Sequence, residues 1–264
     1  MWQKLCHCPF MSAPRDFWLA GVDGCKDGWL VVLIRPDGQE VRICDTPIKK
    51  FGDVITMATL IAVDMPIGLP ELGGREAEKL VRPLLGRLSR SVFPVPSRKA
   101  VFSERGPFSD QAERYAAHQR ACVVAAATSK PSRRVTMQTF GIFPKIQDVD
   151  ESLRSTPRAM DRVFEVHPEV AFWQLNGGEP LTEPKKRKGK LNLPGIAHRR
   201  ELLRKAHFPE DCLNAKAPKG ADIDDLLDAL ACAAVARKIF KKLAISFPSP
   251  PIRDACGIPM AIWA

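Results

Sequence analysis

The stretch FWLAGVDGCKDGWLVVLIRPDGQEVRICD, residues 17–45, decides the fold of this chain. It contains three apolar segments, at 17–23, 29–34 and 40–45, which are separated by the short connections GCKDG and PDGQ. Glycine, aspartate and proline favour tight turns, and apolar segments of this length favour β-strands. The stretch therefore predicts an antiparallel meander of three strands.

Two further strands are expected later in the chain. Residues 47–58 favour a helical connection, and TLIAVD at 59–64 is the continuous apolar run of a strand that is buried on both faces. Residues 71–160 show helical periodicity and predict a helical insertion, after which DRVFEVHPE at 161–169 resumes a strand pattern. Right-handed crossovers would place strand four parallel to strand one, with strand five beyond it. We therefore expect an α/β fold with a five-stranded mixed sheet, a three-strand antiparallel meander plus two parallel strands, flanked by helices.

The last third of the chain is predicted to be mostly helical. The segment EVAFWQLNGG favours a helix that its two glycines end. A polar loop bounded by prolines is expected at 180–195, followed by helices at about 196–206 and 222–242.

The domain boundaries follow from these elements. We expect a disordered leader at 1–15, a single domain with its helical insertion at 16–245, and a C-terminal tail packing on the surface at 246–264. A zinc site at Cys6, His7 and Cys8 is disfavoured, because no second Cys/His pair lies at the required spacing. The sequence leaves open the oligomeric state and whether translation starts at Met1 or at Met11.

Composition narrows the class of protein. The chain has 264 residues, 45% of them hydrophobic, which is enough for a substantial core. Its 40 Lys+Arg against 30 Asp+Glu give a net charge of +10, which favours an anionic partner such as nucleic acid, although a merely basic protein would look the same. Eight scattered cysteines without a CxxC pair favour reduced thiols in the cytoplasm. No run of about 18 apolar residues is present, so we expect no membrane association.

Acidic residues end several apolar segments, where a charge is unexpected. Asp23 ends WLAGVD, and Asp64 ends TLIAVD. Each could serve a turn or a helix cap, but the ends of neighbouring parallel strands meet at one edge of a sheet, where ligands bind in open α/β folds. Glu165, in RVFEVHP, could instead be an exposed strand residue, and His167 could be hydrogen-bonded to the backbone.

The last predicted helix carries four aspartates near its start. Capping and the helix dipole explain Asp222, Asp224 and Asp225. Asp228 lies one turn further on, and the following residues 229–236 carry no charge. A helix that is apolar on all sides is buried, so the carboxylates at its start should point into the protein.

Converging carboxylates indicate a cation site. They repel one another unless they are protonated or surround a cation, and oxygen ligands favour Mg²⁺ or Mn²⁺. Two such ions about 4 Å apart can activate a water and stabilise the leaving oxygen of a phosphodiester. We take Asp23, Asp64 and Asp228 as metal ligands, with Asp225 and Glu165 completing the catalytic shell or orienting water.

With these residues in place, the chain resembles a ribonuclease-H-like family of predicted nucleases known as domain-of-unknown-function family 429. The matching segments, which span roughly residues 19–240, are GVDGCKDGW, AVDMPIGLP, GREAEKLVRPLLGRLSRSVFPVPSR, QTFGIFPKI, VFEVHPEVAFW and DDLLDALACA. The resemblance implies a ribonuclease-H-like fold with a five-stranded sheet. It also implies that Asp23, Asp64 and the pair Asp225 and Asp228 stand where the wider class, including Holliday-junction resolvases, holds its metal ligands. Glu165 matches the family's motif in strand five.

Basic residues offer candidate phosphate contacts, because guanidinium groups bind phosphate oxygens in pairs. The arginines that recur in the insertion are Arg75, Arg82, Arg87, Arg90 and Arg98. We take Arg75, Arg82 and Arg98 as candidate substrate-binding residues. The alternative for the first two is an ion-pair ladder with Glu78 on one helical face. The basic run at 185–190 could likewise hold a nucleic-acid backbone or only keep a loop solvated.

The leading functional prediction is a metal-dependent nuclease that cleaves phosphodiester bonds of nucleic acid by a carboxylate-held two-metal mechanism. An alternative is a non-catalytic nucleic-acid-binding protein of the same fold. A phosphotransferase of the actin and sugar-kinase kind starts with a similar acidic hairpin, but the sequence shows no second phosphate-binding hairpin and no GxxxxGK[ST] loop. The sequence does not distinguish DNA from RNA, or endonuclease from exonuclease.

Overall fold

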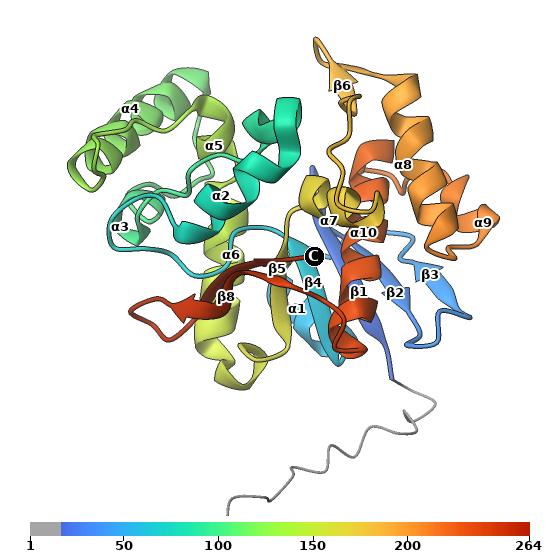
Figure 1. The fold of residues 1–264 in the computed structure, drawn as a ribbon. Coiled ribbons are helices and arrows are strands. Elements are labelled where there is room, and N and C mark those ends of the chain that lie inside the picture. Colours follow the sequence, from blue (N-terminus) through green and yellow to red (C-terminus); the bar gives the residue numbers. More distant parts are fainter. Residues whose placement is uncertain (1–16) are drawn as a thin grey trace, which may run out of the picture.

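A seven-stranded mixed sheet forms the centre of the computed structural model, which describes residues 17–264 (Figure 1). The strand order is β3-β2-β1-β4-β5-β9-β8. The leader expected at 1–15, which includes Cys6, His7 and Cys8, lies outside the described residues. The strands of the sheet are β1 (Leu19–Cys25), β2 (Gly28–Ile34), β3 (Val41–Ile43), β4 (Leu60–Asp64), β5 (Val163–Val166), β8 (Ser246–Arg253) and β9 (Pro259–Trp263).

The predicted meander and the two parallel strands are confirmed. Strand β2 runs antiparallel to β1 and β3, β4 is parallel to β1, and β5 is parallel to β4. The register pairs Asp23 with Asp64, and Val63 with Glu165. Successive side chains point to opposite faces of a sheet, so Asp23 and Asp64 share one face and Glu165 points to the other.

The expectation of five strands and a surface tail is wrong, because residues 246–264 contribute two further strands. Strand β9 pairs in parallel with β5, and β8 pairs antiparallel with β9 at the edge of the sheet. The prolines of SFPSPPIR argue against a strand because proline lacks the N–H that the ladder needs, but an edge strand tolerates them. The register shift between Phe247 and Ile252 falls at these prolines.

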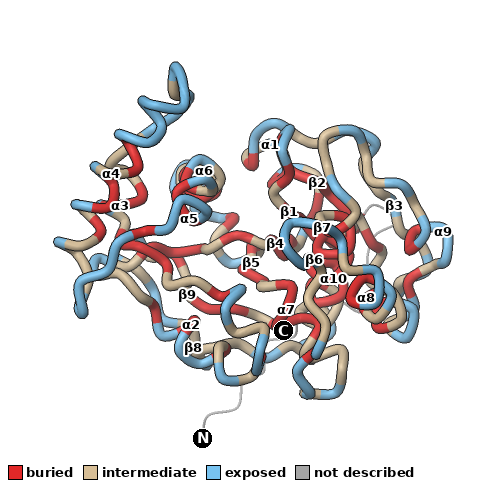
Figure 2. Tube along the Cα trace, turned by 90° about the horizontal axis from the view of Figure 1, so that it is seen from above, coloured by how far each residue is buried: buried red, intermediate tan, exposed pale blue. Residues whose placement is uncertain are grey.

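Helix α10 (Ile223–Phe240) covers the face of the sheet to which the two aspartates point. It is buried throughout Leu226 to Ala236 and packs closely on β1. A Cβ atom at Gly21 would lie 2.1 Å from the carbonyl oxygen of Ala229, so this approach requires a glycine. Figure 2 shows the central strands and α10 as buried, while the peripheral helices are more exposed.

Helices from the segment between β4 and β5 cover the other face, together with α1 (Phe51–Met57). Residues 65–162 contain no β-strand and agree with the predicted helical insertion. Phe143 and Ile146 of this segment belong to the same apolar cluster as Val22 and Val63 of the sheet. The helices are α2 (Glu76–Val81), η1 (Arg82–Ser91), α3 (Arg98–Val101), α4 (Gln111–Ala127), α5 (Met137–Gly141), α6 (Phe143–Ser155) and η2 (Pro157–Ala159).

The remaining elements lie on the α10 side of the sheet. The helix expected in EVAFWQLNGG is α7 (Pro168–Leu175), and the loop expected at 180–195 contains a small hairpin. Among residues 17–264, none of the helices combines the length and the apolar character that crossing a membrane requires. The elements of this part are β6 (Lys186–Arg187), β7 (Lys190–Leu191), α8 (Leu193–Lys205) and α9 (Glu210–Leu213).

Candidate metal centre

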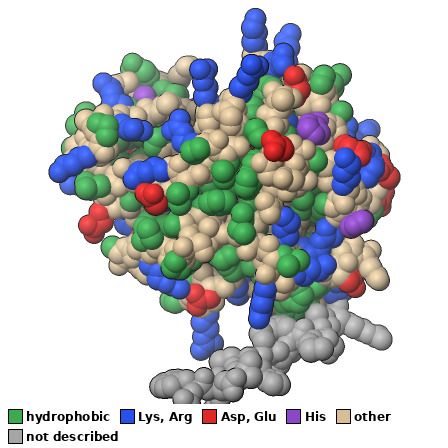
Figure 3. All heavy atoms as spheres, viewed as in Figure 1, with side chains coloured by type: hydrophobic (Ala, Val, Ile, Leu, Met, Phe, Trp, Pro, Cys, Tyr) green, Lys and Arg blue, Asp and Glu red, His purple; other side chains and the backbone are tan. Residues whose placement is uncertain are grey.

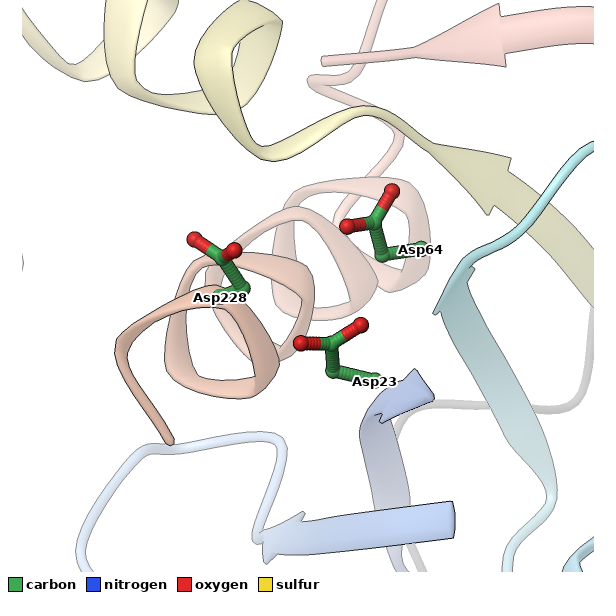
Figure 4. A group of neighbouring side chains, drawn as sticks. All are labelled: Asp23, Asp64 and Asp228. Carbon is green, nitrogen blue, oxygen red and sulfur yellow. The ribbon is translucent and has the colours of Figure 1, made fainter. Parts of the chain in front are cut away.

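The carboxylates of Asp23, Asp64 and Asp228 converge at one edge of the sheet, from the ends of β1 and β4 and the start of α10 (Figure 4). One oxygen of each lies within 4.8 Å of the others. Asp23 and Asp228 are buried, with 7% and 4% of their surface exposed, and Asp64 is half-buried. The structure therefore brings together the three residues that the sequence singles out as metal ligands, and we call them the acidic group.

Local packing explains this convergence. Side chains alternate along a strand, so Asp23 lies on the same face as Gly21, against which α10 packs. Asp228 directly precedes Ala229, whose carbonyl oxygen lies against Gly21. Asp64 is the register partner of Asp23 on β4. The close contact between α10 and β1 thus places the carboxylate of Asp228 beside the ends of β1 and β4.

Burial and repulsion by neighbouring carboxylates raise the pKa values of the three carboxylates in the acidic group. Burial, together with the charges of Asp64 and Asp228, raises the pKa of Asp23 well above its usual range. Burial and the charge of Asp228 do the same to the pKa of Asp64. Burial also raises the pKa of Asp228 to about 6, although the nearby Lys185 acts to lower it. A cation bound among these carboxylates would relieve the repulsion.

The acidic group fits a hard divalent cation. Oδ1 of Asp228 is buried and has no hydrogen-bond partner, and no group in the described part of the chain donates a hydrogen bond to the carboxylate of Asp64. A buried carboxylate oxygen without a partner is costly, and a bond to a metal ion would satisfy it. Mg²⁺ binds oxygens at about 2.1 Å in octahedral geometry, so two ligands of one ion lie about 3 Å apart when adjacent and about 4.2 Å apart when opposite. The oxygens of the acidic group, within 4.8 Å of one another, lie near this range. Oxygen ligands of this kind favour Mg²⁺ or Mn²⁺.

A lysine that the sequence shows only as part of a basic run lies beside the acidic group. The ammonium group of Lys185 donates a hydrogen bond to Oδ2 of Asp228. Burial acts to lower the pKa of Lys185, but attraction by Asp228 and Glu169 outweighs it and raises the pKa above its usual value. Lys185 is therefore a lasting positive charge at this edge of the sheet.

The other aspartates of α10 have different partners. Asp225, predicted to complete the shell, accepts a hydrogen bond of 2.8 Å from the backbone N–H of Asp222 and so caps the helix. Asp224 forms an ion pair of 2.7 Å with Lys186. Asp225 and Asp224 line the same cleft as the acidic group but are not members of it.

Glu165 and Arg75, predicted as a catalytic and a substrate-binding residue, are engaged with each other. The Glu165 carboxylate accepts hydrogen bonds of 2.6 and 2.7 Å from Arg75, and a third, of 2.7 Å, from the backbone N–H of Ile67. Arg75 also pairs with Glu78 and is only 3% exposed. Because Glu165 is the register partner of Val63, it points away from the acidic group and anchors the insertion to the sheet. Both residues line the cleft described below, and their catalytic and substrate-binding roles stay predictions.

The two other predicted substrate-binding arginines do not reach the cleft. Arg98 forms ion pairs of 2.7 Å with Asp254 and with an aspartate of α6, so it ties the insertion to the C-terminal strands. Arg82, at the start of η1, lies outside the cleft lining. The same helix does present two exposed arginines to the cleft, Arg87 and Arg90.

A cleft of about 1000 Å³ contains the acidic group. Its lining also includes basic side chains from two separate segments, Arg87 and Arg90 of η1 and Lys186 and Arg187 of β6. Figure 3 shows Lys and Arg side chains projecting from the upper edge of the molecule, where Figure 1 places β6. The cleft therefore combines a candidate cation site with groups that bind phosphate.

His167 joins α7 to the helix that carries these arginines. Its Nδ1 accepts a hydrogen bond of 3.2 Å from the N–H of Glu169, so Nε2 carries the proton and donates to the carbonyl oxygen of Ser91 at 3.4 Å. Burial lowers the pKa of His167, which keeps the ring neutral. His167 thus has the backbone-bonded role that was the alternative to a catalytic one, and it holds the end of η1 near the cleft.

The fold and the site together define a class: a mixed α/β protein with an acidic group, a candidate cation site, at the carboxyl ends of its central parallel strands. Residues 21–253 match the family described as protein of unknown function, DUF429, and the chain belongs to this family. The match covers the whole acidic group and Lys185, and it confirms the family that the sequence motifs indicated. No curated protein and no solved structure gives a significant match to the chain.

Proposed function

We propose that the protein is a divalent-metal-dependent phosphodiesterase that cleaves nucleic acid, with Asp23, Asp64 and Asp228 as ligands of Mg²⁺ or Mn²⁺. The observation that carries this proposal is the unpartnered Oδ1 of Asp228, within an acidic group that shares a cleft with exposed arginines. Carboxylates alone would repel a phosphodiester, whereas a bound cation and arginines attract it. The net charge of +10 also favours a polyanionic partner.

The residues of the cleft would divide the work between them. The three aspartates would hold the ion at the ends of two rigid strands. A bound Mg²⁺ or Mn²⁺ supplies a water of lowered pKa and offsets negative charge on a phosphate oxygen. Arg87 and Arg90 would bind phosphates on either side of the cleaved bond and fix its position along the cleft. The ion pair between Arg75 and Glu165 would hold the arginine-bearing insertion against the sheet.

We also propose that the fold is ribonuclease-H-like. The order β3-β2-β1-β4-β5, with an antiparallel meander followed by two parallel strands, supports this relationship. So does the position of α10, whose acidic start meets the ends of β1 and β4. On this view β9 and β8 are additions beyond β5 that extend one side of the sheet.

Nuclease assays with defined metal content test the proposed activity. Protein dialysed against a chelator is supplied with Mg²⁺ or Mn²⁺ and incubated with single-stranded, duplex, hybrid and branched nucleic acids. We expect cleavage of at least one of these substrates with added metal and none with the chelator present. Failure to cleave any of them, by protein shown to be folded by circular dichroism, would argue against the proposal.

A non-catalytic nucleic-acid-binding protein would give a different result. In such a protein the basic residues would account for binding, and the acidic group would be unnecessary for it. The Asp228→Asn variant separates the two cases, because it should abolish cleavage by an enzyme while leaving salt-dependent nucleic-acid binding by either protein intact.

A further inference from the structure

We infer that Lys185 takes the place of a second metal ion, so that the site binds one divalent cation and completes its positive charge with an ammonium group. This inference rests on the proposed function and deepens it. It differs from the two-metal mechanism that the sequence led us to expect, and it assigns a role to a residue on a separate loop.

Asp228 divides its two oxygens between two cation positions. Oδ2 is bonded to the ammonium group of Lys185, and Oδ1 is buried without a partner. In a two-metal site, a bridging carboxylate offers one oxygen to each ion in the same way. In this chain the lysine fills one of the two positions, and Oδ1 is left without a partner. Because one oxygen of Asp228 lies within 4.8 Å of an oxygen of Asp23 and of Asp64, a single ion could bind all three residues.

The balance of charge favours a single ion. When ionised, the three aspartates of the acidic group and Lys185 carry a net charge of −2, which one divalent cation neutralises. Two divalent ions beside the same lysine would leave an excess of two positive charges. Three of the other carboxylates of the cleft each have a basic partner, and a fourth, Glu78, shares Arg75 with Glu165. These pairs are Asp224 with Lys186, Glu165 with Arg75, and Glu169 with Arg199. Asp225, without such a partner, caps the start of α10, where the helix dipole favours a negative charge.

The backbone on either side of Lys185 is held firmly against α8. The carbonyl oxygen of Pro184 accepts a hydrogen bond of 2.8 Å from Nδ2 of Asn192, and the carbonyl oxygen of Lys185 accepts one of 2.8 Å from the backbone N–H of Asn192. A Cβ atom at Gly195 would lie 2.2 Å from the carbonyl oxygen of Pro184, so the two segments are in close contact. The backbone that carries Lys185 is thus fixed by its contacts with the start of α8. A fixed position is what we expect of an ammonium group that replaces a metal ion.

Arg199 connects the loop that carries Lys185 to α7, which begins just after the end of β5. It is fully buried, donates hydrogen bonds of 2.6 and 2.7 Å to Glu169 of α7, and donates another, of 2.8 Å, to the carbonyl oxygen of Glu183. Arg199 therefore links the lysine-bearing loop to α7, which helps to fix the position of Lys185 relative to the strand ends.

Counting the bound ions tests the inference. Folded, metal-free protein is titrated with Mn²⁺ by calorimetry, and electron paramagnetic resonance then distinguishes isolated ions from exchange-coupled pairs. We expect one Mn²⁺ per wild-type chain and an isolated-ion spectrum. In Lys185→Met, loss of the ammonium group should allow a second Mn²⁺ to bind or make the first bind about tenfold more tightly. Lys185→Arg, which keeps the charge, should retain a count of one.

The control is Lys241→Met, the same change at an exposed lysine beyond the far end of α10, about 20 Å along the helix from Asp228. Two ions of similar affinity in the wild-type chain would overturn the inference and leave the proposed function standing. An unchanged count and affinity in Lys185→Met would also overturn it. A wild-type chain that binds no Mn²⁺ would overturn both. The wild-type count needs no variant, so it remains decisive even where Lys185→Met does not fold.

Discussion

Asp23 and Asp64 are register partners on two parallel strands, and both carboxylates leave the same face of the sheet at the same edge. This relationship follows from two features of the sequence, an aspartate at the end of each apolar run and a right-handed crossover between the runs. The third carboxylate, Asp228, comes from a helix about 160 residues further along the chain. Its approach depends on the close contact of α10 with Gly21, so the site is a product of packing as well as of topology.

The acidic group should be required for both metal binding and cleavage. We expect Asp228→Asn to weaken Mn²⁺ binding and to lower the rate of cleavage by about 100-fold or more, because a ligand charge is lost while the shape of the side chain is kept. Calorimetry and a single-turnover assay measure the two effects. The matched control is Asp45→Asn, at an exposed position after β3, which should change neither. Cleavage at the wild-type rate by Asp228→Asn would remove this aspartate from the mechanism.

The raised pKa values predict how metal binding depends on pH. The pKa of Asp228 is about 6 in the folded chain, compared with an ordinary value of 3.8. In metal-free protein the fold favours the protonated form, so this contribution to stability is complete below the ordinary pKa and is lost as the pH rises through about 6. A metal ion binds only the ionised carboxylates. Once bound, it relieves the repulsion between them that destabilises the metal-free protein above about pH 6.

We therefore expect Mn²⁺ to raise Tm more at about pH 7.5 than at about pH 5.5, with roughly 2.7 kcal/mol of added stability at a concentration of 100 Kd. Thermal melts of the same sample with and without Mn²⁺ at both pH values give the comparison. A metal-induced increase in Tm that is as large at the lower pH would show that these carboxylates do not control binding.

The parts of the site that the sequence revealed are those with a local pattern. Asp23 and Asp64 end apolar runs, and Asp228 interrupts an otherwise apolar helix, so each was visible without the structure. Lys185 was not, because one lysine in a basic run has no distinguishing neighbour, and its contact with Asp228 depends on how the loop packs on α8. The pairing of Glu165 with Arg75 was hidden for a related reason. An offset of one residue in the pairing of β5 with β4 turns its side chain to the other face, and no local pattern records that register.

The fold was predictable to a similar extent. The meander and the parallel strands follow from apolar runs and turn residues, whereas β8 contains prolines that normally argue against a strand. Its place at the edge of the sheet, where a missing N–H costs little, is a property of the whole architecture. The roles of Arg75 and Arg98 were equally hidden, because their carboxylate partners Glu165 and Asp254 lie 90 and 156 residues away in the sequence.

Gly21→Ala should destabilise the fold strongly. The added methyl group would lie 2.1 Å from the carbonyl oxygen of Ala229 and 2.2 Å from the backbone nitrogen of Ala233, so α10 would have to move away from β1. We expect a loss of about 3 kcal/mol or more in the free energy of unfolding, measured by urea denaturation. Gly52→Ala, within α1 and with its nearest new contact at 3.6 Å, is the control and should be neutral or slightly stabilising.

Arg75→Met should act on stability rather than on substrate binding. It would leave Glu165 buried without its partner, a change that typically costs about 3–5 kcal/mol. Denaturant unfolding measures this loss, and the exposed pair of Lys79 with Glu76 provides a control, since Lys79→Met should cost no more than about 0.5 kcal/mol. Wild-type stability combined with weakened substrate binding in Arg75→Met would instead support the substrate-binding role that the sequence suggests.

Arg87 and Arg90 should show the opposite behaviour. Both are exposed on η1 and line the cleft, and neither forms an ion pair within residues 17–264. Their replacement by alanine should therefore leave the free energy of unfolding within about 0.5 kcal/mol of wild type. If each binds one phosphate, each substitution should weaken nucleic-acid binding and lower the slope of log K against log salt by about one.

Fluorescence anisotropy over a series of salt concentrations, with Ca²⁺ in place of Mg²⁺ to slow cleavage, measures both the affinity and the slope. Arg82→Ala is the matched control, because Arg82 belongs to the same helix but lies outside the cleft lining. We expect its slope to equal that of wild type. Slopes equal to that of wild type in all three variants would show that Arg87 and Arg90 do not bind the phosphate backbone of a nucleic acid. A small phosphodiester would then be the better substrate class for the acidic group.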